Sequence, residues 1–121
     1  MIILDTNFLI YLAKYRLIHL LDDVRSQLAV PDAVIEELEM LSIKAGKIKD
    51  REAAKLALSI IEKWNIKLLE CGGNADSAIL LLAEKNRAKV ATMDKILSES
   101  LRKRGIFVIK LRQKKRLIMC Q

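Results

Sequence analysis

The stretch MIILDTN, residues 1–7, decides the fold, because four apolar residues lead directly into Asp5, Thr6 and Asn7. A short apolar run that stops at polar residues is typical of a buried strand of a parallel sheet. Ligands of open α/β sheets gather beyond the carboxyl ends of the strands, so Asp5 is the first candidate site residue. The alternative is that Asp5 only caps the helix that follows.

Strand-like and helix-like segments alternate along the rest of the chain. Strands are predicted at 2–5, 28–30, 66–69, 88–92 and 107–110, with a short sixth strand at 117–120 paired at an edge. Helices are predicted at 6–15, 18–27, 32–42, 51–64, 74–86 and 94–104, and an exposed turn at 45–50. This alternation predicts an α/β fold, with a mostly parallel sheet and helices on both faces. With 121 residues the chain is expected to form a single domain, residues 1–121.

The composition favours a protein of the cytoplasm. No apolar run approaches the roughly 20 residues that span a bilayer. Met1 begins the first predicted strand directly, so no signal peptide is expected. The two cysteines, Cys71 and Cys120, lie far apart in the sequence and suit a reducing compartment. We therefore expect a cytoplasmic protein without a membrane partner.

The positive charge is concentrated at the C-terminal end. The formal net charge is +7, and residues 101–121 contain eight Lys and Arg and no acid, whereas the first hundred residues are nearly neutral. A local basic segment, at about 102–116, is an electrostatic footprint for a polyanion such as RNA. The alternative is a solvated end that only aids solubility.

Three further carboxylates follow predicted strands. Glu37 lies between Val34 and Leu41 on a helix, at spacings that put it at the edge of the apolar face. Asp76 and Asp94 each stand at the start of a helix, just ahead of an apolar stripe. A carboxylate that faces a core is costly unless something compensates it. The alternatives are an ion pair for Glu37 and helix capping for the two aspartates.

Together with Asp5, these three acids are expected at one edge of the sheet. Four carboxylates crowded there would repel one another, and oxygen-rich sites of this kind select hard cations such as Mg²⁺ or Mn²⁺. No histidine or cysteine joins them, which argues against zinc. A metal ion would activate a water and stabilise charge on a phosphate. The sequence thus predicts a site for one or two ions that cuts RNA, and the basic segment would attract the substrate.

Four motifs in this order resemble the PIN-domain ribonucleases over nearly the whole chain. They are ILDTN at 3–7, PDAVIEEL at 31–38, GGNADSAIL at 72–80 and VATMDKIL at 90–97. The resemblance implies a three-layer α/β/α sandwich around a five-stranded sheet of order 3-2-1-4-5. It also implies a divalent-metal-dependent endoribonuclease that cuts single-stranded RNA, leaves a 5′-phosphate and forms a homodimer.

The resemblance also implies roles for individual residues. The catalytic and metal-binding residues would be Asp5, Glu37, Asp76 and Asp94. Hydrogen bonds that support them would come from Thr6, Asn7 and Thr92. The basic residues expected to bind RNA are Arg102, Lys103, Arg104, Arg112, Lys114, Lys115 and Arg116. One departure is Met93, since the family often has asparagine before the fourth acid.

Three functions remain open at this point. The ending GIFVIKLRQKKRL, 105–117, is similar to PIN proteins of small-subunit ribosomal RNA processing, so the first hypothesis is an endoribonuclease that acts on ribosomal RNA. The second is a toxin ribonuclease that an antitoxin protein neutralises. The third is a non-catalytic PIN module that only binds RNA. The sequence has no Gly-rich phosphate loop that would favour a nucleotide-binding protein.

Overall fold

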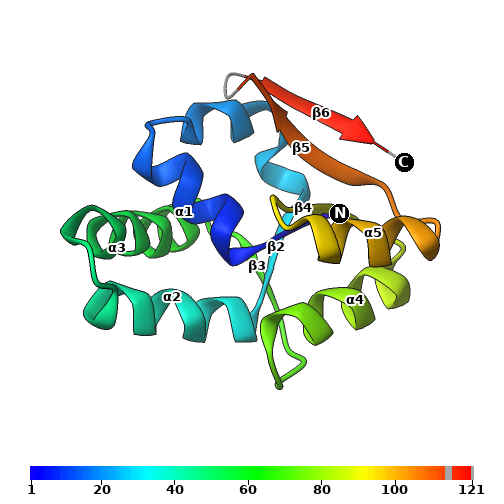
Figure 1. The fold of residues 1–121 in the computed structure, drawn as a ribbon, viewed down its shortest axis with the longest axis horizontal. Helices are drawn as coiled ribbons and strands as arrows, with labels where there is room; N and C mark the ends of the chain where they lie inside the picture. The colour runs from blue at the N-terminus through cyan, green and yellow to red at the C-terminus, as the bar shows by residue number, and fades with distance from the viewer. Residues whose placement is uncertain (114–115, 121) are drawn as a thin grey trace.

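A computed structural model describes residues 1–113 and 116–120, which form one sheet of six strands flanked by helices (Figure 1). The strand order is β3-β2-β1-β4-β5-β6. In sequence order, the strands are β1 Ile2–Leu4, β2 Leu28–Pro31, β3 Lys67–Leu69, β4 Lys89–Ala91, β5 Val108–Arg112 and β6 Arg116–Cys120. The first five are parallel, and β6 runs antiparallel to β5. The predicted order 3-2-1-4-5 is confirmed.

The five-stranded sheet that the resemblance implies is one strand short, whereas the sixth edge strand predicted from the residues is confirmed. The extra strand is the segment predicted at 117–120, which pairs with β5 along its whole length, from Val108 opposite Cys120 to Arg112 opposite Arg116. Its apolar residues Leu117 and Ile118 are half-buried. An antiparallel neighbour needs only a hairpin and no crossover helix, so the chain can add this strand at the edge in a few residues.

The helices form two groups on either side of the sheet. The elements are α1 Thr6–Lys14, the 3₁₀ segment η1 Ile18–Gln27, α2 Asp32–Lys44, α3 Ile48–Lys63, α4 Ala75–Asn86 and α5 Lys95–Lys103. Helices α1, α2 and α3 pack on one another, and α4 and α5 gather at the other side (Figure 1). This arrangement confirms the predicted α/β/α class. In the described residues, no helix combines the length and apolarity that a transmembrane span requires.

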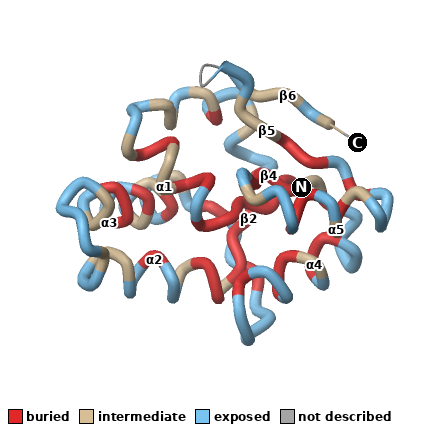
Figure 2. Tube along the Cα trace, viewed as in Figure 1, coloured by how far each residue is buried: buried red, intermediate tan, exposed pale blue. Residues whose placement is uncertain are grey.

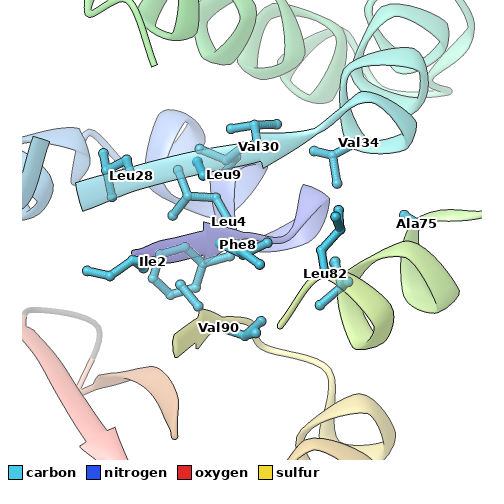
Figure 3. Close-up of a cluster of buried hydrophobic side chains, with 14 of the residues drawn as sticks. Ile2, Leu4, Phe8, Leu9, Leu28, Val30, Val34, Ala75, Leu82 and Val90 are labelled. Carbon is cyan, nitrogen blue, oxygen red and sulfur yellow. The ribbon is translucent and has the colours of Figure 1, made fainter. Parts of the chain in front are cut away.

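The core runs through the central strands and both helix groups. Strands β1, β2 and β4 are buried almost throughout (Figure 2). Leu4 and Val90 from neighbouring strands pack with Phe8 of α1 and Leu82 of α4 (Figure 3). Phe8 is fully buried. Helices cover both faces of these strands, so each strand must be a continuous apolar run, as MIIL at 1–4 is.

The edge of the sheet that carries the site is set by β1 and β4. The crossovers run from β1 outward to β2 and β3, and then return to β4 on the other side of β1. Such a reversal leaves a crevice beyond the carboxyl ends of the two strands, where open α/β sheets bind ligands. The Asp5 amide donates to the Ala91 carbonyl at 3.0 Å, so the residues after the two strands start side by side.

Trp64 lies outside the central core. It follows α3 and is half-buried. The Arg25 guanidinium lies over its ring, 3.8 Å from the ring centroid. A cation above an indole face is attracted by the ring quadrupole. The contact therefore fixes η1 against the end of α3. Trp64 is thus a boundary residue that packs against the core and leaves part of its surface exposed.

Candidate active site

Asp5 is the most buried charged residue of the site, with only 5% of its surface exposed. Its Oδ1 accepts the Thr6 amide at 2.8 Å, and its Oδ2 accepts the Thr92 hydroxyl at 2.7 Å. Burial raises the pKa of Asp5 above its ordinary value, although these two hydrogen bonds oppose the rise. A buried carboxylate fixed at both oxygens is pre-oriented and can turn an unshared lone pair toward a ligand.

Thr92 joins Asp5 to the fourth acid. Thr92 is fully buried, and its hydroxyl accepts the Asp94 amide at 3.1 Å while it donates to Asp5. The Asp94 carboxylate is half-buried and caps α5, where its Oδ1 accepts the Leu97 amide at 3.0 Å. The structure therefore joins the Asp5 carboxylate to the backbone of Asp94 through a single hydroxyl. Helix capping, the alternative for Asp94, is observed as well and leaves its second oxygen free of the cap.

Asp76 and Glu37 come from two other helices, α4 and α2. Asp76 lies in the first turn of α4, just after the cap Asn74, whose side chain accepts the Ser77 amide at 2.9 Å. Glu37 lies one turn into α2. The negative charges of Asp76 and Glu37 raise the pKa of Asp5 further, so both carboxylates are close enough to act on it.

Glu37, predicted at the edge of the apolar face of its helix, lies outside that face. Both Glu37 and Asp76 are exposed, so neither bears a desolvation cost. Val34 and Leu38 fill the buried stripe of α2, and Glu37 lies just beyond its margin, at the open edge of the sheet. No ion pair within the described residues neutralises any of the four acids, because the three pairs found there join other residues.

The four carboxylates are not drawn together into a cage. Within residues 1–113 and 116–120, no three His, Cys, Asp or Glu side chains stand close enough to hold a metal ion as they are. Repulsion among bare carboxylates favours this spread, and the cap made by Asp94 turns one of them toward its own helix. The ligand assignment for the four acids therefore stays a prediction.

The expected supporting residues differ in their surroundings. Thr6 is buried, and its hydroxyl has no hydrogen-bond partner among the described residues. A buried unpartnered hydroxyl is rare and costly, and it marks a place where a further polar ligand would be stabilising. Asn7 is exposed and lines a separate pocket with Ile10 and Leu41. Thr92 has the clearest role, as the bridge described above.

Asp32 was not singled out from the sequence, yet it holds part of the site in place. Its carboxylate accepts the amides of Ala33, Cys71 and Gly72 at 2.8–3.2 Å. The bond from Gly72 is the main reason why the pKa of Asp32 is lowered. Asp32 thus ties the start of α2 to the loop that leads to Asp76. The only sequence signal was an aspartate right after Pro31, which looks like an ordinary cap.

The basic segment is divided between the two ends of the sheet. Arg102, Lys103 and Arg104 lie at the C-terminal end of α5, and Arg104 forms an ion pair with Glu84. Helix α5 starts at the acidic edge and has 9 residues, a rise of about 13 Å, so these three lie away from the acids. Arg112 and Arg116 lie at the carboxyl end of β5 and the start of β6, on the acidic edge. Lys114 and Lys115 lie outside the described residues.

Comparisons with known proteins agree with the motifs and the fold. The family model described as a PIN-like domain matches residues 2–114. Ribonuclease VapC4 of Methanocaldococcus jannaschii is 36% identical, over 94% of this chain and 92% of its own. Ribonuclease VapC9 of Archaeoglobus fulgidus is 30% identical, over 97% of this chain and 87% of its own.

A solved structure has the same fold. It is a domain of a functionally unknown protein from Methanocaldococcus jannaschii, and it superposes with a TM-score of 0.60. The match covers 99% of this chain and 96% of that chain, at 19% identity. At this identity the similarity supports the α/β/α architecture and carries no information on activity.

Proposed function

The chain belongs to the PIN-like domain family, and from this premise we propose that it is an endoribonuclease that cleaves single-stranded RNA with a bound divalent cation. Two relatives that match nearly the whole chain are named ribonucleases. The observation that carries the proposal is the buried Asp5, bridged by Thr92 to Asp94 at the reversal point of the sheet. The proposal covers residues 1–121 as a single nuclease domain.

The chemistry of the donors fits Mg²⁺ or Mn²⁺. We propose that Asp5, Glu37, Asp76 and Asp94 hold one or two such ions, since all their donors are oxygen atoms and no cation among the described residues compensates them. The unpartnered Thr6 hydroxyl next to Asp5 is consistent with this. When bound, the ion would supply an activated water and would stabilise charge on the phosphate.

The chain's own groups offset part of the cost of ionising the buried Asp5, the form that a cation needs. The Thr92 hydroxyl and the Thr6 amide bond the two oxygens of Asp5, and both bonds favour the ionised form. Burial excludes water from the same carboxylate. Asp5 is thus oriented and ready to bind, while the exposed Glu37 and Asp76 can move toward a ligand at little cost, because neither is packed in the core.

Among the biological roles, we favour a toxin ribonuclease. Both curated relatives are named VapC ribonucleases, and this name supports the toxin alternative over ribosomal RNA processing. We therefore propose that the partners are single-stranded RNA, a second copy of the chain in a homodimer, and an antitoxin protein in the cytoplasm. The resemblance of residues 105–117 to ribosomal RNA-processing proteins keeps ribosomal RNA as the second candidate substrate.

Cleavage of RNA by the purified protein tests the proposal. Single-stranded RNA should be cut with Mg²⁺ or Mn²⁺ present, and the Asp5→Asn variant or an excess of chelator should abolish cutting. Equal cleavage by the variant would refute the assigned site. Growth arrest on expression, relieved by a neighbouring antitoxin gene, is expected for the toxin role. Normal growth with fully active protein would favour the ribosomal alternative.

A further inference from the structure

A small pocket opens beside the acidic edge, between α5 and the end of β5. Its volume is about 180 Å³, and its lining residues are Thr92, Met93, Lys95, Ser98, Lys110 and Leu111. We call it the Lys95–Lys110 pocket. Thr92 belongs to this pocket and also donates a hydrogen bond to Asp5, so the pocket and the acidic site share a wall.

The register of the sheet puts Lys110 next to the end of β4, where Thr92 lies. The Thr92 amide donates to the Ile109 carbonyl, so β5 continues past the end of β4 with Lys110 as its next residue. Ile109 is buried, and side chains alternate along a strand, so Lys110 points to the opposite face from Ile109. Lys95 comes from the first turn of α5. Two distant parts of the chain thus each contribute a lysine to the lining of one pocket.

Both lysines are available for a ligand. Lys95 is exposed and Lys110 is half-buried, and neither forms an ion pair with a carboxylate within the described residues. Ser98 is 98% buried as a residue on the side of α5 that lines the pocket, which gives the floor a hydroxyl. Two ammonium groups, which can only donate hydrogen bonds, and a hydroxyl, which can donate one, suit an anion in a small hollow.

The size and lining select the kind of anion. Pockets that enclose a small organic ligand usually measure roughly 300–1,000 Å³, so this pocket is too small for a whole nucleotide. None of its six lining residues is aromatic, and single-stranded bases are generally held by stacking on aromatic rings. What fits is one phosphate group whose sugar and base remain outside.

We propose that the Lys95–Lys110 pocket binds one backbone phosphate of the RNA strand, next to the phosphate that is cut at the acidic site. The proposal rests on the proposed function, since the strand must cross the acidic edge to reach both places. It also provides the attraction that the acids lack, because Lys95 directly follows Asp94 in the chain. The bound phosphate would set the position of the strand relative to Asp5.

RNA binding by non-cleaving protein tests the pocket apart from catalysis. In an Asp5→Asn background, the double change Lys95→Gln and Lys110→Gln should lower the affinity for single-stranded RNA roughly tenfold. Each partly exposed ion pair changes affinity roughly two- to fivefold. The slope of log K against log salt should fall by about 0.7, the amount for one phosphate on a single strand. Arginine at both positions should restore most of the affinity.

A matched control and a chemical probe sharpen the result. Lys55→Gln with Lys63→Gln removes the same charge from exposed positions of α3 and should leave affinity nearly unchanged. RNA with a neutral methylphosphonate at successive linkages should bind more weakly at one position, and only when Lys95 and Lys110 are present. If the two double variants bind alike, the pocket holds no phosphate. Absence of cleavage by the wild type would instead refute the proposed function.

Discussion

Replacing Thr92 by valine tests the hydrogen-bonded bridge that joins Asp5 to Asp94. Valine keeps the shape of threonine but lacks the hydroxyl that donates to Asp5 at 2.7 Å and accepts the Asp94 amide at 3.1 Å. A hydrogen bond to a charged group contributes about 1.5–3 kcal/mol. We expect a loss of about 2 kcal/mol, because the added methyl offsets part of the cost and water can reach the partly buried Asp94 amide.

The loss should depend on pH in metal-free protein. The Thr92 bond lowers the pKa of Asp5, so Thr92→Val should raise it further. The folded variant then binds protons more readily than the folded wild type, and the difference in free energy of unfolding should grow as pH rises through the pKa of Asp5. For a domain of this size, about 2 kcal/mol lowers Tm by roughly 8 °C. Thermal unfolding followed by circular dichroism from pH 4 to 8, in EDTA, measures this.

Thr92→Ser provides the matched control. Serine keeps the hydroxyl and loses one buried methyl, which costs about 1 kcal/mol at every pH. Cation affinity should also fall about 10- to 100-fold in Thr92→Val, as it does when a residue that orients a metal ligand is lost. If the valine and serine variants unfold at the same temperature at pH 7, with parallel pH profiles, the bridge contributes nothing and the reasoning fails.

Three further changes follow from the same geometry. Burial raises the pKa of Asp5, so the neutral carboxyl stabilises the folded state fully below pH 3.8, and this contribution is lost as pH rises through the folded pKa. Asparagine cannot ionise, so Asp5→Asn should raise Tm at pH 7 in EDTA but not at pH 3. Mg²⁺ or Mn²⁺ at a hundredfold excess over its Kd should stabilise the wild type by about 2.7 kcal/mol and Asp5→Asn far less, measured as a shift in Tm. Arg112→Gln with Arg116→Gln should lower the salt slope of RNA binding by about 1.4, while Lys103→Gln with Arg104→Gln should leave it unchanged in the same titration.

Much of the fold could be predicted because the central strands of a covered sheet accept only apolar residues. A strand covered by helices on both faces must be apolar at every position, and Ile2, Ile3 and Leu4 satisfy this without alternation. The polar residues after such strands then fall at one edge, which is why Asp5 and Asp94 could be expected at the same edge from the sequence. The sixth strand was visible only as a short apolar run, since pairing at an edge leaves no periodic signal of its own.

The surroundings of single side chains were harder to predict. Helical spacing puts Glu37 at the edge of the apolar face of α2. Whether a residue at that edge is buried depends on which helix or strand packs against it. Helix α2 packs mainly on α3, and this leaves Glu37 open. Lys110 was missed for a similar reason. Within a predicted strand, a lone lysine looks like an outward-facing residue. Only the register with β4 shows that Lys110 is the first residue of β5 beyond the position paired with Thr92.

The division of the basic segment limits what net charge can say about RNA binding. Residues 102–104 are close in sequence to Arg112 and Arg116, but α5 and β5 run in opposite directions, so the two described groups lie at opposite ends of the sheet. Attraction between charges falls off over about 10 Å at moderate salt, and α5 rises about 13 Å, so the first group contributes little at the acidic edge, whereas the second group lies on that edge. With the Lys95–Lys110 pocket between that group and Asp5, the positive charge forms a path along the end of β5. An RNA strand on this path would reach the acids from the β6 side, which predicts stronger crosslinking to Arg112 than to Arg104.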